Sequence, residues 1–232
     1  MNIVITGGSK GIGKAVAIKF AANDHKIFIC SRNKKDLAET AKEINKKYKD
    51  AVQYFPADVS KKISAEKFSL WLQEKNIMPD ILINNAGQFL PGSVHNEEDG
   101  VLEQMIAANL YSAYYITRTL LPGMMERKSG HIFNMCSIAS LSAYDNGGSY
   151  GISKHALMGF SKNLREEMKP YNIKVTAVYP GAVFTDSWEG SGIKATRVMQ
   201  AGDIAELVYI SSFLSPQACV EDIVVRPQLG DL

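Results

Sequence analysis

The chain has 232 residues, of which 46% are hydrophobic and 22% are charged, as is typical of one globular domain with a sizeable core. The formal net charge of +2 gives no reason to expect a partner nucleic acid or an anionic membrane surface. The three cysteines stand far apart, which argues against a disulfide framework and against a metal site. No basic leader precedes the first apolar run. We therefore expect a single cytoplasmic domain over 1–232 that binds no metal.

Short apolar runs alternate with longer amphipathic runs along the chain. We expect strands over 3–6, 26–30, 52–55, 81–83, 131–135, 173–178 and 222–225. We expect helices over about 11–22, 35–49, 98–125, 148–169 and 203–213, and a further helix that carries Phe68 and Trp71. This alternation implies right-handed crossovers, and so it predicts an α/β fold: a doubly wound, Rossmann-type parallel sheet flanked by helices on both faces. The least regular stretch, 184–197, contains the run Gly190, Ser191 and Gly192.

A glycine-rich turn follows the first predicted strand and opens the first predicted helix. It consists of Thr6, Gly7, Gly8, Ser9, Lys10, Gly11, Ile12 and Gly13. Glycines at such a turn let the backbone approach a pyrophosphate, and the helix N-terminus supplies free N–H groups. The spacing is Gly-x-x-x-Gly-x-Gly and differs from the common Gly-x-Gly-x-x-Gly fingerprint. Its place between a strand and a helix favours a dinucleotide site over an ordinary glycine-rich turn.

The end of the second predicted strand bears on the choice of cofactor. An Asp or Glu there would bind the ribose 2′-hydroxyl of NAD, but this chain has Ser31 and Arg32. A hydroxyl and a guanidinium suit a 2′-phosphate, and Lys10 in the glycine turn would approach the same phosphate. The sequence therefore predicts NADP(H) rather than NAD(H). The alternative is that Arg32 and Lys10 are merely solvated cations.

Three residues in the second half of the chain suggest proton transfer. Tyr150 and Lys154 are four apart in a predicted helix, so they share one face. An ammonium near a phenol stabilises the phenolate, and a poised phenol exchanges a proton with a substrate oxygen. Ser137 follows an apolar strand and would hydrogen-bond the same oxygen. Taken alone, Tyr-x-x-x-Lys also fits a surface tyrosine beside a solvated lysine.

Taken together, the motifs resemble those of the short-chain dehydrogenase/reductase family over nearly the whole chain. The residues that match the family's motifs are, in chain order, Gly7, Gly11, Gly13, Asp58, Val59, Asn84, Asn85, Ala86, Gly87, Asn109, Ser137, Tyr150, Lys154, Pro180, Gly181, Val183 and Thr185. Each motif is modest alone, but their order and separations together are highly specific.

The resemblance implies a role for several of these residues. Asp58 and Val59 would contact the adenine ring, and the turn of Asn85, Ala86 and Gly87 would form part of the cofactor site. Asn109 would help to hold a proton-relay water near Lys154, whose ammonium would also bond the nicotinamide ribose. The segment of Pro180, Gly181, Val183 and Thr185 would clasp the nicotinamide carboxamide.

Structural roles are the alternative for some of these residues. Asp58 also fits a turn or a helix N-cap, and Thr185 also fits a helix cap. Asn84 and Asn85 would tie neighbouring loops together through their amides, which is compatible with a place in the site.

These features predict an NADP(H)-dependent oxidoreductase that interconverts a small carbonyl compound and its alcohol by hydride transfer, with Tyr150 as the general acid/base. The alternative is a catalytically weak NADP(H)-binding sensor on the same fold. The short segment between Thr185 and Asp203 predicts a small substrate such as a hydroxy acid, a keto acid or a compact ketone. Apolar residues on the helices around Asn109 and after Tyr150 predict a homodimer or homotetramer.

Overall fold

The fold is that of a computed structural model, which describes residues 1–185 and 192–230. Its centre is a sheet of seven parallel strands in the order β3-β2-β1-β4-β5-β6-β9. These strands are β1 (Asn2–Thr6), β2 (Lys26–Ser31), β3 (Val52–Pro56), β4 (Ile81–Asn84), β5 (Gly130–Met135), β6 (Ile173–Pro180) and β9 (Asp222–Val225). The predicted parallel, doubly wound sheet is thereby confirmed.

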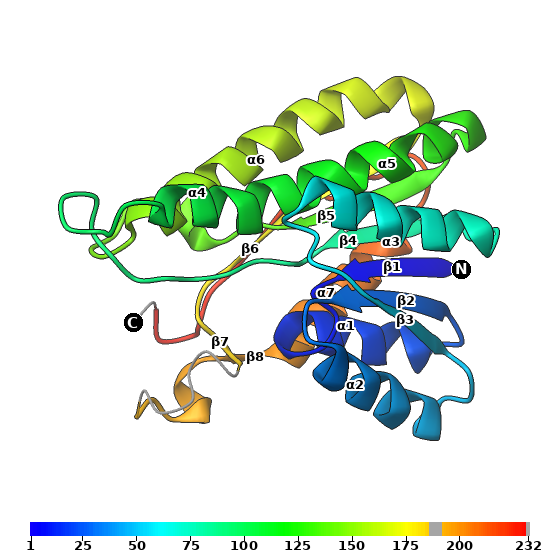
Figure 1. The fold of residues 1–232 in the computed structure, drawn as a ribbon, viewed down its shortest axis with the longest axis horizontal. Helices are drawn as coiled ribbons and strands as arrows, with labels where there is room; N and C mark the ends of the chain where they lie inside the picture. Colours follow the sequence, from blue (N-terminus) through cyan, green and yellow to red (C-terminus); the bar gives the residue numbers. More distant parts are fainter. Residues whose placement is uncertain (186–191, 231–232) are drawn as a thin grey trace.

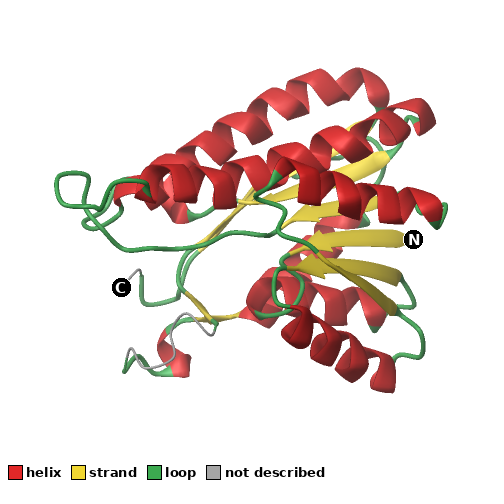
Figure 2. Cartoon of the chain, in the orientation of Figure 1, coloured by secondary structure: helices red, strands yellow, loops and turns green. Residues whose placement is uncertain are grey.

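Helices cover both faces of the sheet, as Figures 1 and 2 show. One face carries α1 (Gly11–Ala21), α2 (Lys34–Lys47) and α7 (Ala201–Ser212), and the other carries α3 (Lys62–Glu74), α5 (Ser112–Arg127) and α6 (Gly148–Met168). Alternate residues of each strand point to opposite faces. Ile3 and Ile5 therefore pack in the core below α1, whereas Val4 packs with Phe68 and Leu120. Both faces of the sheet are covered at its centre, so 3–5, 27–30 and 81–83 in β1, β2 and β4 are continuous buried apolar runs.

The long helix predicted over about 98–125 is interrupted. It comprises α4 (Val101–Ile106), a π-helical turn (Ala107–Tyr111) and α5. It begins after Gly100, whose φ of +90° is a left-handed conformation that suits glycine. The π turn inserts one residue into the helical ladder and so changes which side chains face the sheet.

A second, two-stranded sheet was not predicted. β7 (Val183–Phe184) pairs in parallel with β8 (Met199–Gln200), just after β6 and just before α7. Strands of two residues are too short to produce a periodic pattern in the sequence. In the irregular stretch predicted over 184–197, Gly190 and Ser191 lie outside the described residues, and Gly192 has a φ of +75°.

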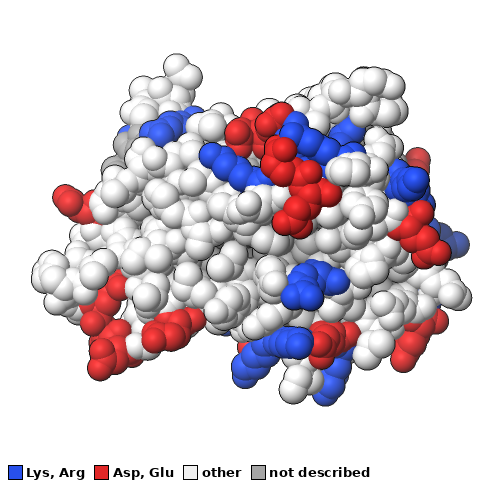
Figure 3. All heavy atoms as spheres, turned by 90° about the horizontal axis from the view of Figure 1, so that it is seen from above, with Lys and Arg blue, Asp and Glu red and all other residues white. Residues whose placement is uncertain are grey.

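The face formed by α5 and α6 is sparsely charged. Seen from that side, a broad uncharged area lies between clusters of Lys, Arg, Asp and Glu (Figure 3). Across the described ranges, the helices are too short or too polar to traverse a bilayer.

Candidate active site

The site lies at the carboxyl edge of the sheet, where the turns after β1 and β4 diverge. In such sheets this switch in strand order leaves a crevice for ligands. The hydroxyl of Thr6 joins the two turns, because its Oγ1 accepts the N–H groups of Asn85 and Ala86 at 3.0 Å each. The Asn85 side chain donates in return to the carbonyls of Thr6 and Gly7. Asn85 therefore has the loop-tying role considered from the sequence.

The glycine turn is shaped by close backbone approaches. Gly7 has a φ of +67°, and a Cβ on it would lie 2.9 Å from Ala86 Cα. A Cβ on Gly13 would overlap the Gly7 carbonyl oxygen, and one on Gly11 would lie 3.0 Å from Thr185 Cγ2. The close approach of this turn to the loop after β4 and to Thr185 therefore requires glycine at these positions. The turn thus fits a pyrophosphate.

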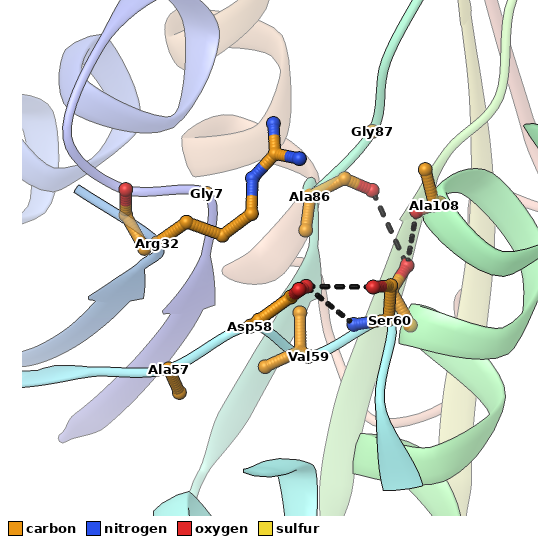
Figure 4. A pocket seen from close by; sticks show the side chains of 11 residues that line it. Gly7, Arg32, Ala57, Asp58, Val59, Ser60, Ala86, Gly87 and Ala108 are labelled. Carbon is orange, nitrogen blue, oxygen red and sulfur yellow. Dashed lines mark hydrogen bonds between the residues drawn. The ribbon is translucent and has the colours of Figure 1, made fainter. Parts of the chain in front are cut away.

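A cavity of about 100 Å³ continues from this turn across the ends of β2, β3 and β4. Its lining comprises Gly7, Ser31, Arg32, Ala57, Asp58, Val59, Ser60, Ala86, Gly87, Ala108 and Ser112. Figure 4 shows Arg32 reaching from the end of β2 into this cavity, between Gly7 and Ala86. Asp58 also makes a local turn, because its Oδ1 accepts the N–H and the hydroxyl of Ser60. The turn and the cavity lining are therefore compatible roles for Asp58.

Two further predicted cofactor residues lie beside this cavity. The hydroxyl of Ser9 donates to Ser31 Oγ at 2.9 Å, so the glycine turn and the end of β2 are linked. Lys10 stands at the N-cap of α1, and its Nζ lies 3.2 Å from Asp36 Oδ2 on α2. Lys10 does not belong to the residues that line the cavity. Ile12 is partly buried and packs against the core, and its contact with a cofactor stays a prediction.

Tyr150 and Lys154 share one face of α6, as the spacing predicted. Lys154 Nζ lies 5.8 Å from the centre of the Tyr150 ring and donates to the Met135 carbonyl at 2.7 Å. The lysine is 7% exposed, so its ammonium is held in place rather than solvated. The Tyr150 ring also makes a T-shaped contact with Phe89, with 4.9 Å between ring centres. The interpretation as a surface pair is therefore wrong.

Ser137 begins a short turn after β5. It caps the 3-10 helix 138–140, where its Oγ accepts the N–H of Ala139 at 3.2 Å. This bond leaves the hydroxyl hydrogen for another acceptor. Burial raises the pKa of the neighbouring Cys136 thiol to about 11, so this thiol stays protonated at neutral pH.

Asn109 lies fully buried in the π turn. Its Oδ1 accepts the N–H of Gln88 at 2.8 Å, and its Nδ2 donates to the Gln88 carbonyl and to Ser153 Oγ. A Cβ on Gly87 would lie 2.8 Å from Asn109 Oδ1 and 3.6 Å from Lys154 Nζ. Asn109 therefore binds the loop after β4 to α6 close to the lysine. Its contact with a relay water stays a prediction.

The segment after β6 is fixed by contacts with β9 and with the glycine turn. The N–H of Gly181 donates to the Val225 carbonyl at 2.8 Å, which fixes the turn after Pro180 against β9. Val183 is buried in the core, and Thr185 meets the glycine turn at Gly11. This segment therefore lies against the first turn of α1.

The sequence did not single out several residues that the structure brings into the site. Ala57, Ser60, Ala108 and Ser112 complete the lining of the cavity. Ser112 follows Asn109 by three residues, so helical spacing could have indicated it. Phe89 comes from an irregular loop with no periodic signal, and its contact with Tyr150 spans 61 positions of chain.

A parallel sheet with a glycine turn at its switch point, and a buried lysine beside a tyrosine, define a nucleotide-binding α/β oxidoreductase. The family model of the short chain dehydrogenases matches residues 1–195. The chain belongs to the short-chain dehydrogenase/reductase family.

Individual relatives are similar over nearly their whole length. An uncharacterized oxidoreductase of Staphylococcus aureus (strain MRSA252) is 30% identical over 97% of this chain and 96% of its own. The closed form of a serine dehydrogenase complexed with NADP+ has a TM-score of 0.90 at 29% identity and covers 100% of this chain and 97% of its own. An alcohol dehydrogenase from the archaeon Thermococcus sibiricus, complexed with 5-hydroxy-NADP, has a TM-score of 0.89 at 26% identity, with 98% and 96% covered.

Proposed function

We propose that this chain is an NADP(H)-dependent dehydrogenase/reductase that interconverts a small carbonyl compound and its alcohol. The observation that carries the proposal is the buried Lys154 ammonium on the same helix face as Tyr150, beside a crevice that fits a dinucleotide. When bound, NADPH supplies the hydride that reduces the carbonyl carbon.

Three side chains handle the proton and the oxygen. The Tyr150 hydroxyl gives its proton to the carbonyl oxygen as the carbon is reduced, so the product is the alcohol and the residue is left as a tyrosinate. The Lys154 ammonium stabilises that tyrosinate, and the Ser137 hydroxyl donates to the same substrate oxygen. Alcohol oxidation follows the same path in reverse.

The preference for NADP(H) rests on Arg32 and Ser31 in the cavity lining. A guanidinium offers a planar, permanently charged fork to a phosphate, and a hydroxyl adds one more donor. The NADP complexes among the structural neighbours support this preference. Titration of the protein with both cofactors, followed by the fluorescence of the reduced nicotinamide, tests it. Tighter binding of NADH would contradict it.

The proposed substrates are short hydroxy acids, keto acids and compact ketones. The short segment between Thr185 and Asp203 supports a small substrate, and so do the serine and alcohol dehydrogenases among the structural neighbours. A panel of such compounds is assayed by the absorbance of NADPH, with steroids and thioesters of long acyl chains as comparison. Turnover confined to the large substrates would overturn this choice.

A sensor without turnover is the second candidate. It is distinguished by the same panel, because it would bind NADPH with normal affinity and oxidise it with none of the carbonyls. The buried Lys154 favours the enzyme, since an ammonium is costly to bury without a role.

We also propose a cytoplasmic homodimer or homotetramer built from one domain over 1–232. Leu102, Tyr111, Tyr114 and Ile152 expose 37–45% of their surface on α4, α5, α6 and the π turn. Three other apolar residues on which the prediction depended, Met105, Ile116 and Leu157, are buried in the core. The broad uncharged area in Figure 3 supports association through this face. A monomeric mass in light scattering at micromolar concentration would contradict it.

A further inference from the structure

Helix α6 begins at a residue that has no means of capping it. Its N-cap is Gly147, and glycine has no side chain to accept a hydrogen bond from the first turn. Glu97 supplies that acceptor from the segment ahead of α4. Its Oε1 accepts the N–H of Ser149 at 2.9 Å, and its Oε2 accepts the Ser149 hydroxyl. A carboxylate 52 residues away thus caps the helix that carries Tyr150.

Two glycines make room for this carboxylate. A Cβ on Gly92 would lie 2.7 Å from Glu97 Cγ, and a Cβ on Gly148 would overlap Glu97 Oε1. Ser149, which receives the carboxylate, is 2% exposed. The Glu97 side chain is therefore partly buried in a position to which its neighbours are fitted, unlike a surface acid that happens to lie near a helix end.

Backbone contacts tie the same two segments together. The N–H of Gly92 donates to the Asn146 carbonyl at 3.1 Å, and Gly92 forms an isolated bridge with Gly147. The hydroxyl of Ser93 donates to Asn146 Oδ1 at 3.1 Å. Asn146 has a φ of +58°, so the chain turns sharply there before α6 starts. The segment 92–97 therefore fixes the place at which α6 begins.

We infer that Glu97 is a positioning residue for catalysis: it fixes the first turn of α6 and so the placement of the Tyr150 hydroxyl. Tyr150 directly follows Ser149, and its ring is already limited by Phe89 on one side. A displacement of about 1 Å at a reacting group costs up to roughly a hundredfold in rate. The inference rests on the proposed role of Tyr150 as the general acid/base.

The test uses the full chain with NADPH bound and compares Glu97→Ala with Glu97→Gln. The glutamine keeps an oxygen for the Ser149 N–H and an amide that donates to Ser149 Oγ. Glu98→Ala is the matched control, because it removes an exposed acid of the same type at the next position. Ser149→Ala is a milder variant that removes only the hydroxyl bond.

Four quantities are measured in each variant: amide hydrogen exchange over 147–154, the Kd of NADPH, and the kcat and KM with an active carbonyl. In Glu97→Ala we expect exchange in the first turn of α6 to rise by roughly fivefold to thirtyfold. We expect kcat to fall by about tenfold to a hundredfold, with the Kd of NADPH within about twofold of wild type. In Glu97→Gln we expect both amide exchange and kcat to return most of the way to the wild-type values. Ser149→Ala is expected to lie between the wild type and Glu97→Ala in both quantities, and Glu98→Ala is expected to match the wild type.

Two outcomes would overturn the inference. Unchanged exchange in Glu97→Ala would refute the cap, and faster exchange with an unchanged kcat would refute its importance for Tyr150. If the folded wild type oxidises NADPH with none of the carbonyls, the proposed function fails and the catalytic part of the inference fails with it. The exchange data still decide whether Glu97 caps α6, so the two failures are distinguishable.

Discussion

Lys154 and Tyr150 lie one helical turn apart on α6, and the lysine ammonium is anchored to the Met135 carbonyl 2.7 Å away. This bond joins the helix to the end of β5, two residues before Ser137. The lysine is therefore fixed relative to both of the residues that would contact the substrate oxygen. In the proposed mechanism, its other two N–H donors would serve a cofactor hydroxyl and a relay water.

Tyr150→Phe is expected to reduce kcat by about a hundredfold to ten-thousandfold, because general acid catalysis contributes about that much. The ring still packs edge-on against Phe89, so the fold and the Kd of NADPH stay near those of the wild type. Steady-state kinetics and a fluorescence titration measure the two quantities. Tyr144→Phe, in the loop before α6, is the control and is expected to keep most of the activity. Substantial turnover by Tyr150→Phe would refute the catalytic assignment.

Asn109→Leu is expected to lower the free energy of unfolding by about 2–3 kcal/mol, because it removes the buried amide that pairs with the partly buried N–H and carbonyl of Gln88. Activity falls with it, since the loop after β4 loses its bond to α6. Urea denaturation and steady-state kinetics measure both effects.

The control for this change is Asn163→Leu. Asn163 is exposed on α6, and within the described part of the chain its side chain donates only to the Gly159 carbonyl of its own helix. We expect its stability to stay within about 0.5 kcal/mol of the wild type. Equal losses in the two variants would contradict the structural importance of Asn109.

Arg32→Asp is expected to weaken NADP(H) binding by at least about tenfold, because it removes a charge-assisted bond to the 2′-phosphate and adds a repulsion. NAD(H) has no such phosphate, so its affinity is expected to change far less. Lys67→Asp makes the same change of charge on the exposed face of α3 and is expected to leave both affinities unchanged. An equal loss for both cofactors in Arg32→Asp would indicate damage to the crevice instead of a lost phosphate contact.

Local patterns in the sequence predicted the strands, most helix positions and the glycine turn. Buried strands and amphipathic helices carry their period in the sequence, and the turn needs glycine at fixed positions because of φ and close approach. The pairing of Tyr150 with Lys154 was predictable for the same reason, since both lie on one helix.

Contacts between distant segments had no such signal. The Glu97 cap on Ser149 and the Lys10 pair with Asp36 depend on how loops from different crossovers meet. The π turn around Asn109 reflects bonds to Gln88 and Ser153 that the helical period does not encode. Such relationships follow from the assembled fold, because no local propensity favours them.

His131 makes the stability of the protein depend on pH. It is buried in β5, and its Nε2 lies 2.7 Å from Thr176 Oγ1, whose own hydroxyl donates to the Val220 carbonyl. Nε2 must therefore carry the hydrogen, and within the described residues Nδ1 has no acceptor for a second proton. Burial, with a smaller contribution from the Lys174 charge, lowers the pKa of His131 to about 3.

Because the pKa of His131 is depressed in the folded state, the protein loses stability as the pH falls. Well above pH 6.5 the imidazole is neutral in both the folded and the unfolded chain, so His131 does not lower the free energy of unfolding there. As the pH falls from 6.5 toward 3, the unfolded chain takes up a proton that the folded chain refuses, and stability declines. At pH 5 we expect His131 to lower the free energy of unfolding by about 2 kcal/mol relative to pH 7.

Urea denaturation at pH 7 and at pH 5 measures this effect in the wild type and in His131→Gln, which does not titrate at this position. We expect the drop between the two pH values to be about 2 kcal/mol smaller in the variant, since the other titrating groups are common to both proteins. His95→Gln removes an exposed histidine and is expected to show the same drop as the wild type. If His131→Gln also showed the wild-type drop, the buried imidazole would not be the group that destabilises the protein in acid.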